Sequence, residues 1–129
     1  MAQIKIYGLK SNLEENRMAI SNSIHKAVMS ALEYPPEKKF HRFISLENEE
    51  FIYPNDRSAK YIIIEISMFE GRTIETKKTL IRELYTNIES QAGINTQDIE
   101  ITIFETPKEN WGIRGLPGDE LTLSYKVEV

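Results

Sequence analysis

The 129-residue sequence contains no cysteine. This absence excludes disulfide bonds, thiolate nucleophiles and cysteine-ligated metal or iron–sulfur sites. It also suits a reducing compartment, so we expect a cytoplasmic protein. Basic residues are outnumbered: 16 Lys and Arg stand against 20 Asp and Glu, giving a formal net charge of −4. No nucleic-acid partner is expected, because such binding depends on neutralising phosphates.

Long apolar stretches are missing as well. The longest, Tyr61–Ile64, is far shorter than the roughly 20 residues that a membrane span needs. The first residues lack the apolar core of a signal peptide. His25, expected on a helix surface, and His41 have no second histidine or acid at metal-ligand spacing. We therefore expect a soluble protein with no membrane partner, no metal and no cofactor.

Hydrophobic periodicity predicts a strand, a helix and a strand in the first half of the chain. Gln3–Gly8 alternates as a strand, and Phe40–Leu46 is the second strand. Ser11 and Glu14 have the spacing of a capping box at the start of the helix. Pro35 and the proline after it end this helix, because proline cannot continue the hydrogen-bond ladder.

The second half of the chain repeats this order. Tyr61–Phe69 is a β-branched run typical of a central strand, and Asp98–Glu105 alternates strongly. Between them Thr73 is expected to be the N-cap of a helix, and Gly93 is expected to end it in a left-handed conformation. The sequence thus predicts two successive β-α-β units.

The two halves, residues 3–46 and 61–105, align with a constant offset of 60. Matching positions are Ile20 and Leu80, Ile24 and Leu84, Val28 and Ile88, and Phe43 and Ile103. We therefore predict one α/β (α+β) domain, residues 1–129, with a four-stranded mixed sheet and two helices on one face. A short hairpin or loop excursion between the halves and a terminal strand, Leu121–Val129, complete the predicted fold.

The predicted sheet has one face that its own helices cannot cover. Tyr61–Ile66 is apolar on both sides, and such strands are usually covered on both faces. Two helices are enough for one face only. We therefore predict that copies of the chain cover the other face in a homo-oligomer.

Two short segments carry a resemblance to a known family. Gly71-Arg72-Thr73-Ile74-Glu75-Thr76-Lys77 opens the second helix, and Trp111-Gly112-Ile113-Arg114-Gly115 lies in a late loop. With the two β-α-β units, these segments resemble the tautomerase superfamily, and within it the malonate semialdehyde decarboxylase-like branch. The resemblance implies a tautomerase (MIF-like) fold, a homotrimer with active sites near subunit interfaces, and keto–enol tautomerase or related isomerase or lyase activity on a small keto acid.

The resemblance also implies roles for individual residues. The family's base is an N-terminal proline; position 2 is Ala2, so the implied base is the amine of Ala2 if Met1 is removed. Arg72 is implied as a clamp for the carboxylate or enolate, although an exposed first-turn arginine is the alternative. Trp111, Arg114 and Arg42 are candidate substrate-binding residues. Packing is the alternative for Trp111, and an ion pair across an interface is the alternative for Arg42.

A second function remains open beside the enzyme. Glu70 and Lys38 stand where the decarboxylase branch carries an arginine and an aspartate, and Ala2 replaces the proline. The alternative is therefore a non-catalytic trimeric protein that binds a small anion or a partner on the same scaffold.

Overall fold

The chain folds as two strand–helix–strand units that share one sheet, as the sequence predicts. The computed structural model describes residues 2–129. Its helices and strands are β1 Ala2–Leu9, α1 Lys10–Leu32, β2 His41–Leu46, β3 Ile62–Phe69, α2 Ile74–Ala92, β4 Ile99–Thr106, β5 Gly112–Ile113 and β6 Leu116–Pro117. Short 3₁₀ turns lie at Asn48–Glu50, Thr96–Asp98, Lys108–Asn110 and Gly118–Glu120.

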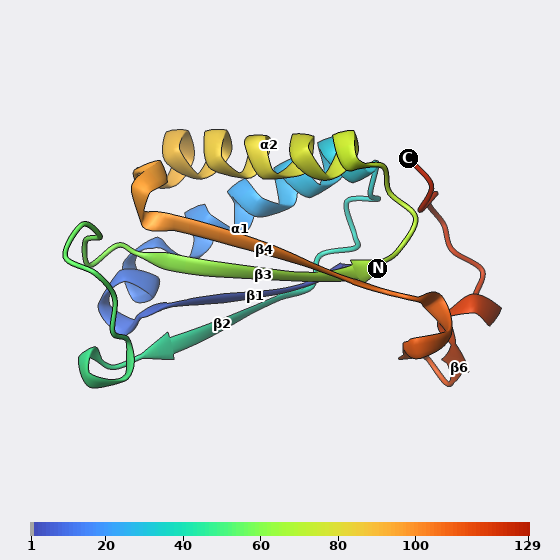
Figure 1. The fold of residues 1–129 in the computed structure, drawn as a ribbon, viewed down its shortest axis with the longest axis horizontal. Coiled ribbons are helices and arrows are strands. Elements are labelled where there is room, and N and C mark those ends of the chain that lie inside the picture. Colours follow the sequence, from blue (N-terminus) through green and yellow to red (C-terminus); the bar gives the residue numbers. More distant parts are fainter. Residues whose placement is uncertain (1) are drawn as a thin grey trace.

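The sheet has the strand order β2-β1-β3-β4, and both helices lie on one of its faces (Figure 1). Within each unit the two strands are parallel, whereas the central strands β1 and β3 are antiparallel. Corresponding elements are evenly spaced: β3 begins 60 residues after β1 (62 − 2), and β4 ends 60 residues after β2 (106 − 46). Because the central pairing is antiparallel, the corresponding ends of the two units lie at opposite ends of the sheet, whereas Lys5 and Glu65 pair at its centre.

The core lies between the helices and the inner face of the sheet. Strand residues alternate between the two faces, so every second residue of β1 and β3 points into this core. The strands contribute Ile4, Ile6, Ile62, Ile64 and Ile66, and the helices contribute Leu13, Ile20, Ile24, Leu80, Leu84 and Ile88. The residues between them in sequence, such as Lys5 and Glu65, point to the outer face.

The ends of the helices follow the sequence only in part. The Thr73 side chain accepts a hydrogen bond from the Thr76 backbone N–H, and Gly93 ends α2 with φ 66°, as predicted. The predicted capping box at Ser11 and Glu14 is wrong. Helix α1 begins at Lys10 and has no side-chain cap, because β1 runs into the helix without an intervening turn.

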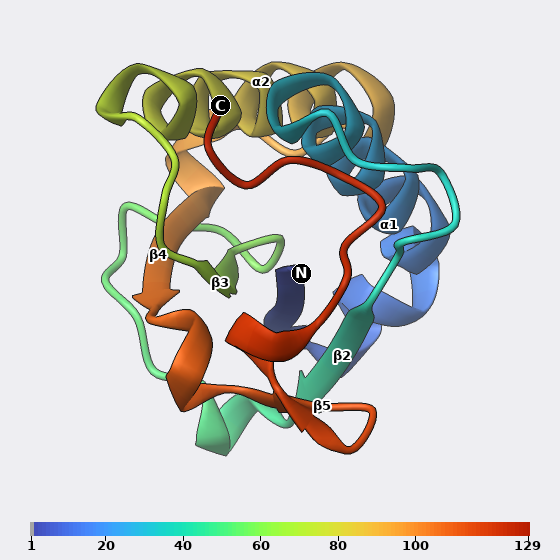
Figure 2. The same cartoon turned by 90° about the vertical axis from the view of Figure 1, so that its right-hand side faces the viewer.

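The segment Leu121–Val129 is not a strand, contrary to the prediction. It crosses one end of the molecule instead (Figure 2), where Val127 is buried and the Val129 carbonyl accepts a hydrogen bond from the Thr73 N–H. Its alternation arises because Tyr125 and Val127 turn inward, Tyr125 against Tyr34, while their neighbours face solvent. The alternation of apolar residues therefore arises from burial of one side of the segment, without hydrogen bonds to a neighbouring strand.

Two further expectations are corrected or refined. Residues 47–60, expected to form a short hairpin or a loop, form a 3₁₀ turn and a loop. The short hairpin of the fold is β5–β6. His25 is 8% exposed rather than on the helix surface, and its Nε2 lies 2.7 Å from the Pro36 carbonyl oxygen. Within residues 2–129 no helix is long and apolar enough to cross a bilayer.

Candidate active site

The outer face of the sheet carries the polar side chains from which a site can be built. Lys5 lies opposite Arg42 on β2 and opposite Glu65 on β3, and Gln3 lies opposite Ser67. The loop of residues 47–60 lies at one end of the sheet and the segment 107–120 at the other (Figure 1). Between these two segments the outer face of the single chain is open.

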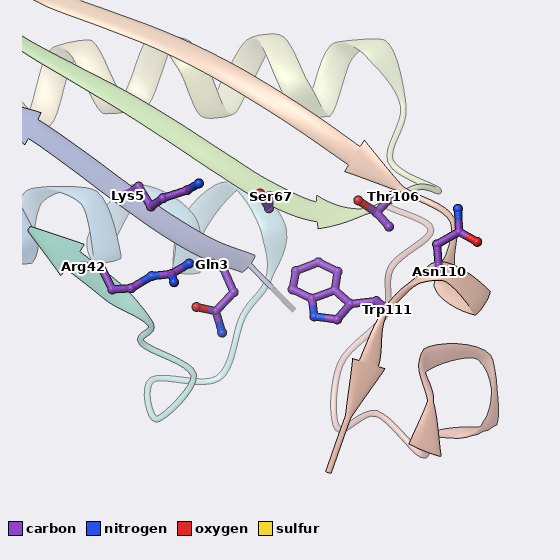
Figure 3. Close-up of a pocket in the computed structure, with 7 residues that line it drawn as sticks. All are labelled: Gln3, Lys5, Arg42, Ser67, Thr106, Asn110 and Trp111. Atoms are coloured by element: carbon purple, nitrogen blue, oxygen red, sulfur yellow. The ribbon is translucent and has the colours of Figure 1, made fainter. Parts of the chain in front are cut away.

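A cleft of about 520 Å³ lies where the segment 107–120 meets the outer face (Figure 3). All four strands of the sheet and the turn after β4 contribute to it. Its lining consists of Gln3, Lys5, Arg42, Ser67, Thr106, Asn110 and Trp111. The site therefore depends on the whole sheet, because no single unit supplies both its cations and its tryptophan.

Two cations and no carboxylate line this cleft. The Lys5 Nζ is 3.9 Å from Glu65 Oε1, which also accepts a 2.9 Å hydrogen bond from the Tyr7 hydroxyl. This hydrogen bond raises the pKa of Tyr7 above its usual value. Arg42 is exposed and has neither a hydrogen bond nor an ion pair with another residue of the described chain. The cleft is therefore positively charged, and the charge of Arg42 is available to an anion.

Trp111 lies at the end of the cleft away from Lys5 and Arg42 (Figure 3). Its ring meets the ring of Phe69 edge-on, with 5.2 Å between centroids, and its carbonyl accepts a 2.7 Å hydrogen bond from the Gly118 N–H. A Cβ at position 118 would lie 2.5 Å from the Lys108 carbonyl oxygen and 2.9 Å from the Phe69 ring. Only glycine fits this close approach, which holds Trp111 beside the cleft.

The structure brings together two of the residues singled out in the sequence. Arg42 and Trp111 both line the cleft. Arg114 lies in the β5–β6 turn with φ 49° and lines a different hollow. Ala2 begins β1 next to Gln3, with its own side chain buried toward the helices, and Met1 lies outside the described residues.

Arg72 does not line the cleft and is only 5% exposed. Its Nη1 donates a 3.2 Å hydrogen bond to the Phe69 carbonyl, and its guanidinium carbon is 5.7 Å from the centre of the Tyr34 ring. The Nε and Nη2 atoms are buried without a partner. The alternative of an exposed first-turn arginine is therefore wrong, while the role of carboxylate clamp stays a prediction.

Five lining residues belong to no motif of the sequence. They are Gln3, Lys5, Ser67, Thr106 and Asn110. Alternation in β1 and β3 marks Gln3, Lys5 and Ser67 as outward-facing, but only the pairing of the strands brings them beside Arg42. The described part of the chain holds no group of three or more acidic or histidine side chains placed to bind a metal ion.

The fold is that of a tautomerase-type α/β protein, and solved structures share this architecture. A malonate semialdehyde decarboxylase inhibited by 3-bromopropiolate is 25% identical with a TM-score of 0.76, over 85% of this chain and 87% of the other. The native fused 4-OT is 20% identical with a TM-score of 0.79, over 92% and 98%. The second likeness concerns the fold alone.

The sequence comparisons identify the family. The family model for tautomerase enzymes matches residues 38–114, and the chain belongs to this family. The probable tautomerase YusQ of Bacillus subtilis is 27% identical over 97 residues, which are 71% of this chain and 76% of YusQ. The predicted resemblance to the tautomerase superfamily and its malonate semialdehyde decarboxylase-like branch is confirmed.

One relative has about the length of a single unit. The 2-hydroxymuconate tautomerase of Comamonas testosteroni is 37% identical over 57 residues, which are 44% of this chain and 90% of that enzyme. That relative is therefore about half as long as this chain, the length of one β-α-β unit with its following loop.

Proposed function

We propose that this chain is a tautomerase-type enzyme whose cleft binds the carboxylate of a small keto acid. The observation that supports the proposal is the pair of cations, Lys5 and Arg42, in a cleft without a lining carboxylate. Arg42 has an unengaged guanidinium, and this group can hold a carboxylate through two parallel hydrogen bonds. Trp111 offers an apolar surface for the remainder of the ligand.

The proposed chemistry moves a proton between carbon and oxygen of the bound keto acid. Such a step needs a base whose pKa lies near the working pH. An α-amino group, with an ordinary pKa of about 7.7–8.0, meets this requirement better than a carboxylate or a lysine. The proposed base is the amine of Ala2 in a chain from which Met1 has been removed, since Ala2 directly precedes the cleft residue Gln3.

Arg42 has a second part in this proposal. When the base removes a proton, negative charge develops on the substrate oxygen, and a fixed cation nearby stabilises that charge. Lys5 is less available for this role because Glu65 lies 3.9 Å from its Nζ. Arg72 is proposed as a further anion contact only in a state in which its buried guanidinium becomes accessible.

The proposal includes assembly through the outer face of the sheet. Phe104 is 47% exposed on this face, and the face has no helix above it. Related fused 4-OT proteins form symmetric and asymmetric trimers. We propose a homotrimer for this chain, and sedimentation at micromolar concentration tests it: a particle of a single 15.0 kDa chain would contradict the assembly.

A second candidate function is a non-catalytic anion-binding protein on the same scaffold. One observation favours it: the seven lining residues include no carboxylate and no histidine that could accept a proton from the ligand. Lys5 could accept a proton only after losing its own. In this alternative Arg42 and Lys5 hold a carboxylate that is not turned over. The two candidates make the same prediction for binding and opposite predictions for turnover.

The decisive experiment measures turnover and binding on the same variants. Ketonisation of the enol of phenylpyruvate and of oxaloacetate is followed by absorbance, with intact mass recorded to establish whether the chain starts at Met1 or Ala2. Arg42→Ala is expected to lower kcat/KM by about 100-fold, the usual cost of losing one such electrostatic contact. Thr102→Ala, at the corresponding position of the second unit, is the matched control and should leave the rate unchanged.

The outcome separates the candidates. A wild-type rate equal to that of buffer, with pyruvate binding that is lost in Arg42→Ala, supports the binding protein and ends the enzyme proposal. A wild-type rate that Arg42→Ala does not change removes the cleft from the mechanism.

A further inference from the structure

The segment Leu121–Val129, here called the strap, covers the end of the molecule at which Arg72 is buried. It follows the turn Gly118–Glu120, passes the connection between α1 and β2, and finishes at the start of α2 (Figure 2). It contains neither helix nor strand. Side-chain contacts and a few hydrogen bonds therefore hold the strap in place, because it has no backbone pairing with a strand.

Two side chains of the strap point inward. The Tyr125 ring packs on the Tyr34 ring with 4.4 Å between centroids. Val127 is 2% exposed and lies against Gly71, where an added Cβ would be 3.0 Å from Val127 Cγ1. Gly71 has φ 130°, so both its conformation and its lack of a side chain admit Val127.

The end of the strap binds the first turn of α2. The Val129 carbonyl oxygen accepts a 3.1 Å hydrogen bond from the Thr73 N–H and a 2.9 Å hydrogen bond from the Thr76 hydroxyl. One ion pair, between Lys108 Nζ and Glu128 Oε1 at 3.8 Å, lies at the surface and adds little. The strap is thus fixed at a small number of points, each of which can be removed separately.

Arg72 lies in the region that these anchors enclose. Burial raises the pKa of Tyr34, and the positive charge of Arg72 opposes this rise. Burial also raises the pKa of Tyr125, and the charge of Arg72 again acts to lower it. The guanidinium carbon lies 5.7 Å from the centre of the Tyr34 ring, and this ring packs on Tyr125 of the strap. The Arg72 Nε and Nη2 atoms, the edge that binds a carboxylate side-on, have no partner.

The unpartnered edge opposes closure of the strap. A buried cation with acceptors for only one of its three guanidinium nitrogens is unfavourable, and either exposure to water or binding of an anion relieves this cost. Segments held by few contacts open locally more readily than the core. The strap therefore combines weak anchoring with a buried group that favours opening.

We propose that the strap is a reversible cover, which shields Arg72 when closed and presents its Nε–Nη2 edge to small carboxylates when open. The proposal rests on the anion contact that the proposed function assigns to Arg72, but its test is separate from turnover, because Arg72 and the strap are not part of the cleft lining. It assigns the strap a regulatory role at a second anion contact.

Arginine labelling with phenylglyoxal, read by peptide mass mapping, tests this proposal on the intact chain. In the wild type Arg72 is expected to react about tenfold more slowly than the exposed Arg82. Val127→Lys should bring the rate at Arg72 to within about threefold of that at Arg82, since a second buried cation beside Gly71 and Arg72 disfavours closure. Millimolar sodium pyruvate should then protect Arg72 in this variant and leave Arg82 unprotected.

Two further variants keep the test decisive. Thr122→Lys places the same side chain at an exposed position of the same segment and should label as the wild type does. Thr76→Val removes one hydrogen bond to Val129 without changing any residue of the strap itself. It should raise the Arg72 rate about threefold even if Val127→Lys fails to keep its helical circular dichroism. Equal labelling of Arg72 and Arg82 in the wild type, or no pyruvate protection after opening, overturns the proposal.

Discussion

The two ends of the outer sheet face have corresponding loops, but one end is filled and the other is a cleft. Phe51 follows the turn Asn48–Glu50, and Trp111 follows the turn Lys108–Asn110, 60 residues later (111 − 51). Phe51 is 9% exposed and stacks on Tyr61, and Tyr53 packs against both rings. Trp111 makes its one ring contact of the described chain with Phe69 and borders the cleft.

The difference arises from the residues that follow each aromatic side chain. After Phe51 the chain returns through Tyr53 and Tyr61 to cover the outer face, whereas after Trp111 the β5–β6 hairpin occupies the next residues. The charges differ as well: the position that corresponds to Arg42 is Thr102. One scaffold therefore has an aromatic plug, formed by Phe51, Tyr53 and Tyr61, at one end and a positively charged cleft at the other.

Truncation of the plug should have the largest effect. Phe51→Ala is expected to lower the free energy of unfolding by about 3 kcal/mol, because it removes a buried ring from the aromatic cluster. Urea denaturation measures this loss. Ile52→Ala, at a side chain 91% exposed, is the control and should change stability little. A Phe51→Ala protein with wild-type stability would mean that the two ends do not differ in packing.

The pH dependence of stability should also distinguish the two halves. Burial, with Lys39 and His25 nearby, lowers the pKa of His41 from 6.5 to about 4, so the folded state favours the neutral ring. Stability is then complete above pH 6.5 and falls as the pH drops toward 4, by about 2 kcal/mol at pH 5. Urea titrations at several pH values measure this change.

The counterpart of His41 in the second unit is Ile101, which does not titrate. His41→Ile should therefore remove most of the acid-dependent loss, although it also removes the contact with Ser21 Oγ, which lies 2.7 Å from His41 Nδ1. If the loss between pH 6.5 and pH 5 persists in His41→Ile, another group is responsible.

Truncation of Trp111 at the cleft should affect ligand binding more than the free energy of unfolding. Trp111→Ala is expected to weaken binding of phenylpyruvate by about 1 kcal/mol, because the aromatic contact is lost while Arg42 remains. Calorimetric titration measures this change, and pyruvate, which has no aromatic ring, serves as the matched ligand and should lose less. Equal losses for both ligands would show that Trp111 positions the cleft and does not contact the ligand.

The smallest effect is expected beside the cleft. Glu65→Gln removes the carboxylate 3.9 Å from Lys5 Nζ, so pyruvate should bind about threefold more tightly, in keeping with the weak coupling of a half-exposed ion pair. The pKa of Tyr7 should fall toward its ordinary value in the same variant, since the hydrogen bond from Tyr7 to Glu65 is the main cause of its rise. Unchanged pyruvate affinity would remove Lys5 from the ligand contacts.

Local patterns predicted most of the fold. Alternation located the strands, Thr73 and Gly93 marked the ends of α2, and the common offset predicted two equivalent units. Alternation failed for Leu121–Val129, because one-sided burial produces the same pattern whether or not a partner strand is present.

The site was less predictable because it depends on pairing. Arg42 and Trp111 could be chosen as candidates from their residue types alone. Lys5 could not, because it reaches the cleft only through the pairing of β1 with β2 and β3. The burial of Arg72 could not be predicted either, since its neighbours Gly71 and Thr73 contact Val127 and Val129, which are distant in sequence. Periodicity describes one element at a time, whereas a cleft is a property of several.

The register of the central strands has a consequence for how such chains assemble. Paired residues of β1 and β3 have numbers that add to 70, and corresponding residues differ by 60, so Lys5 and Glu65 satisfy both relations (5 + 65 and 65 − 5). This pair therefore sits on the approximate two-fold axis that relates the units. Two identical halves would place the same residue against itself there, and like charges would repel. The difference in sequence between the two halves is what allows opposite charges on that axis.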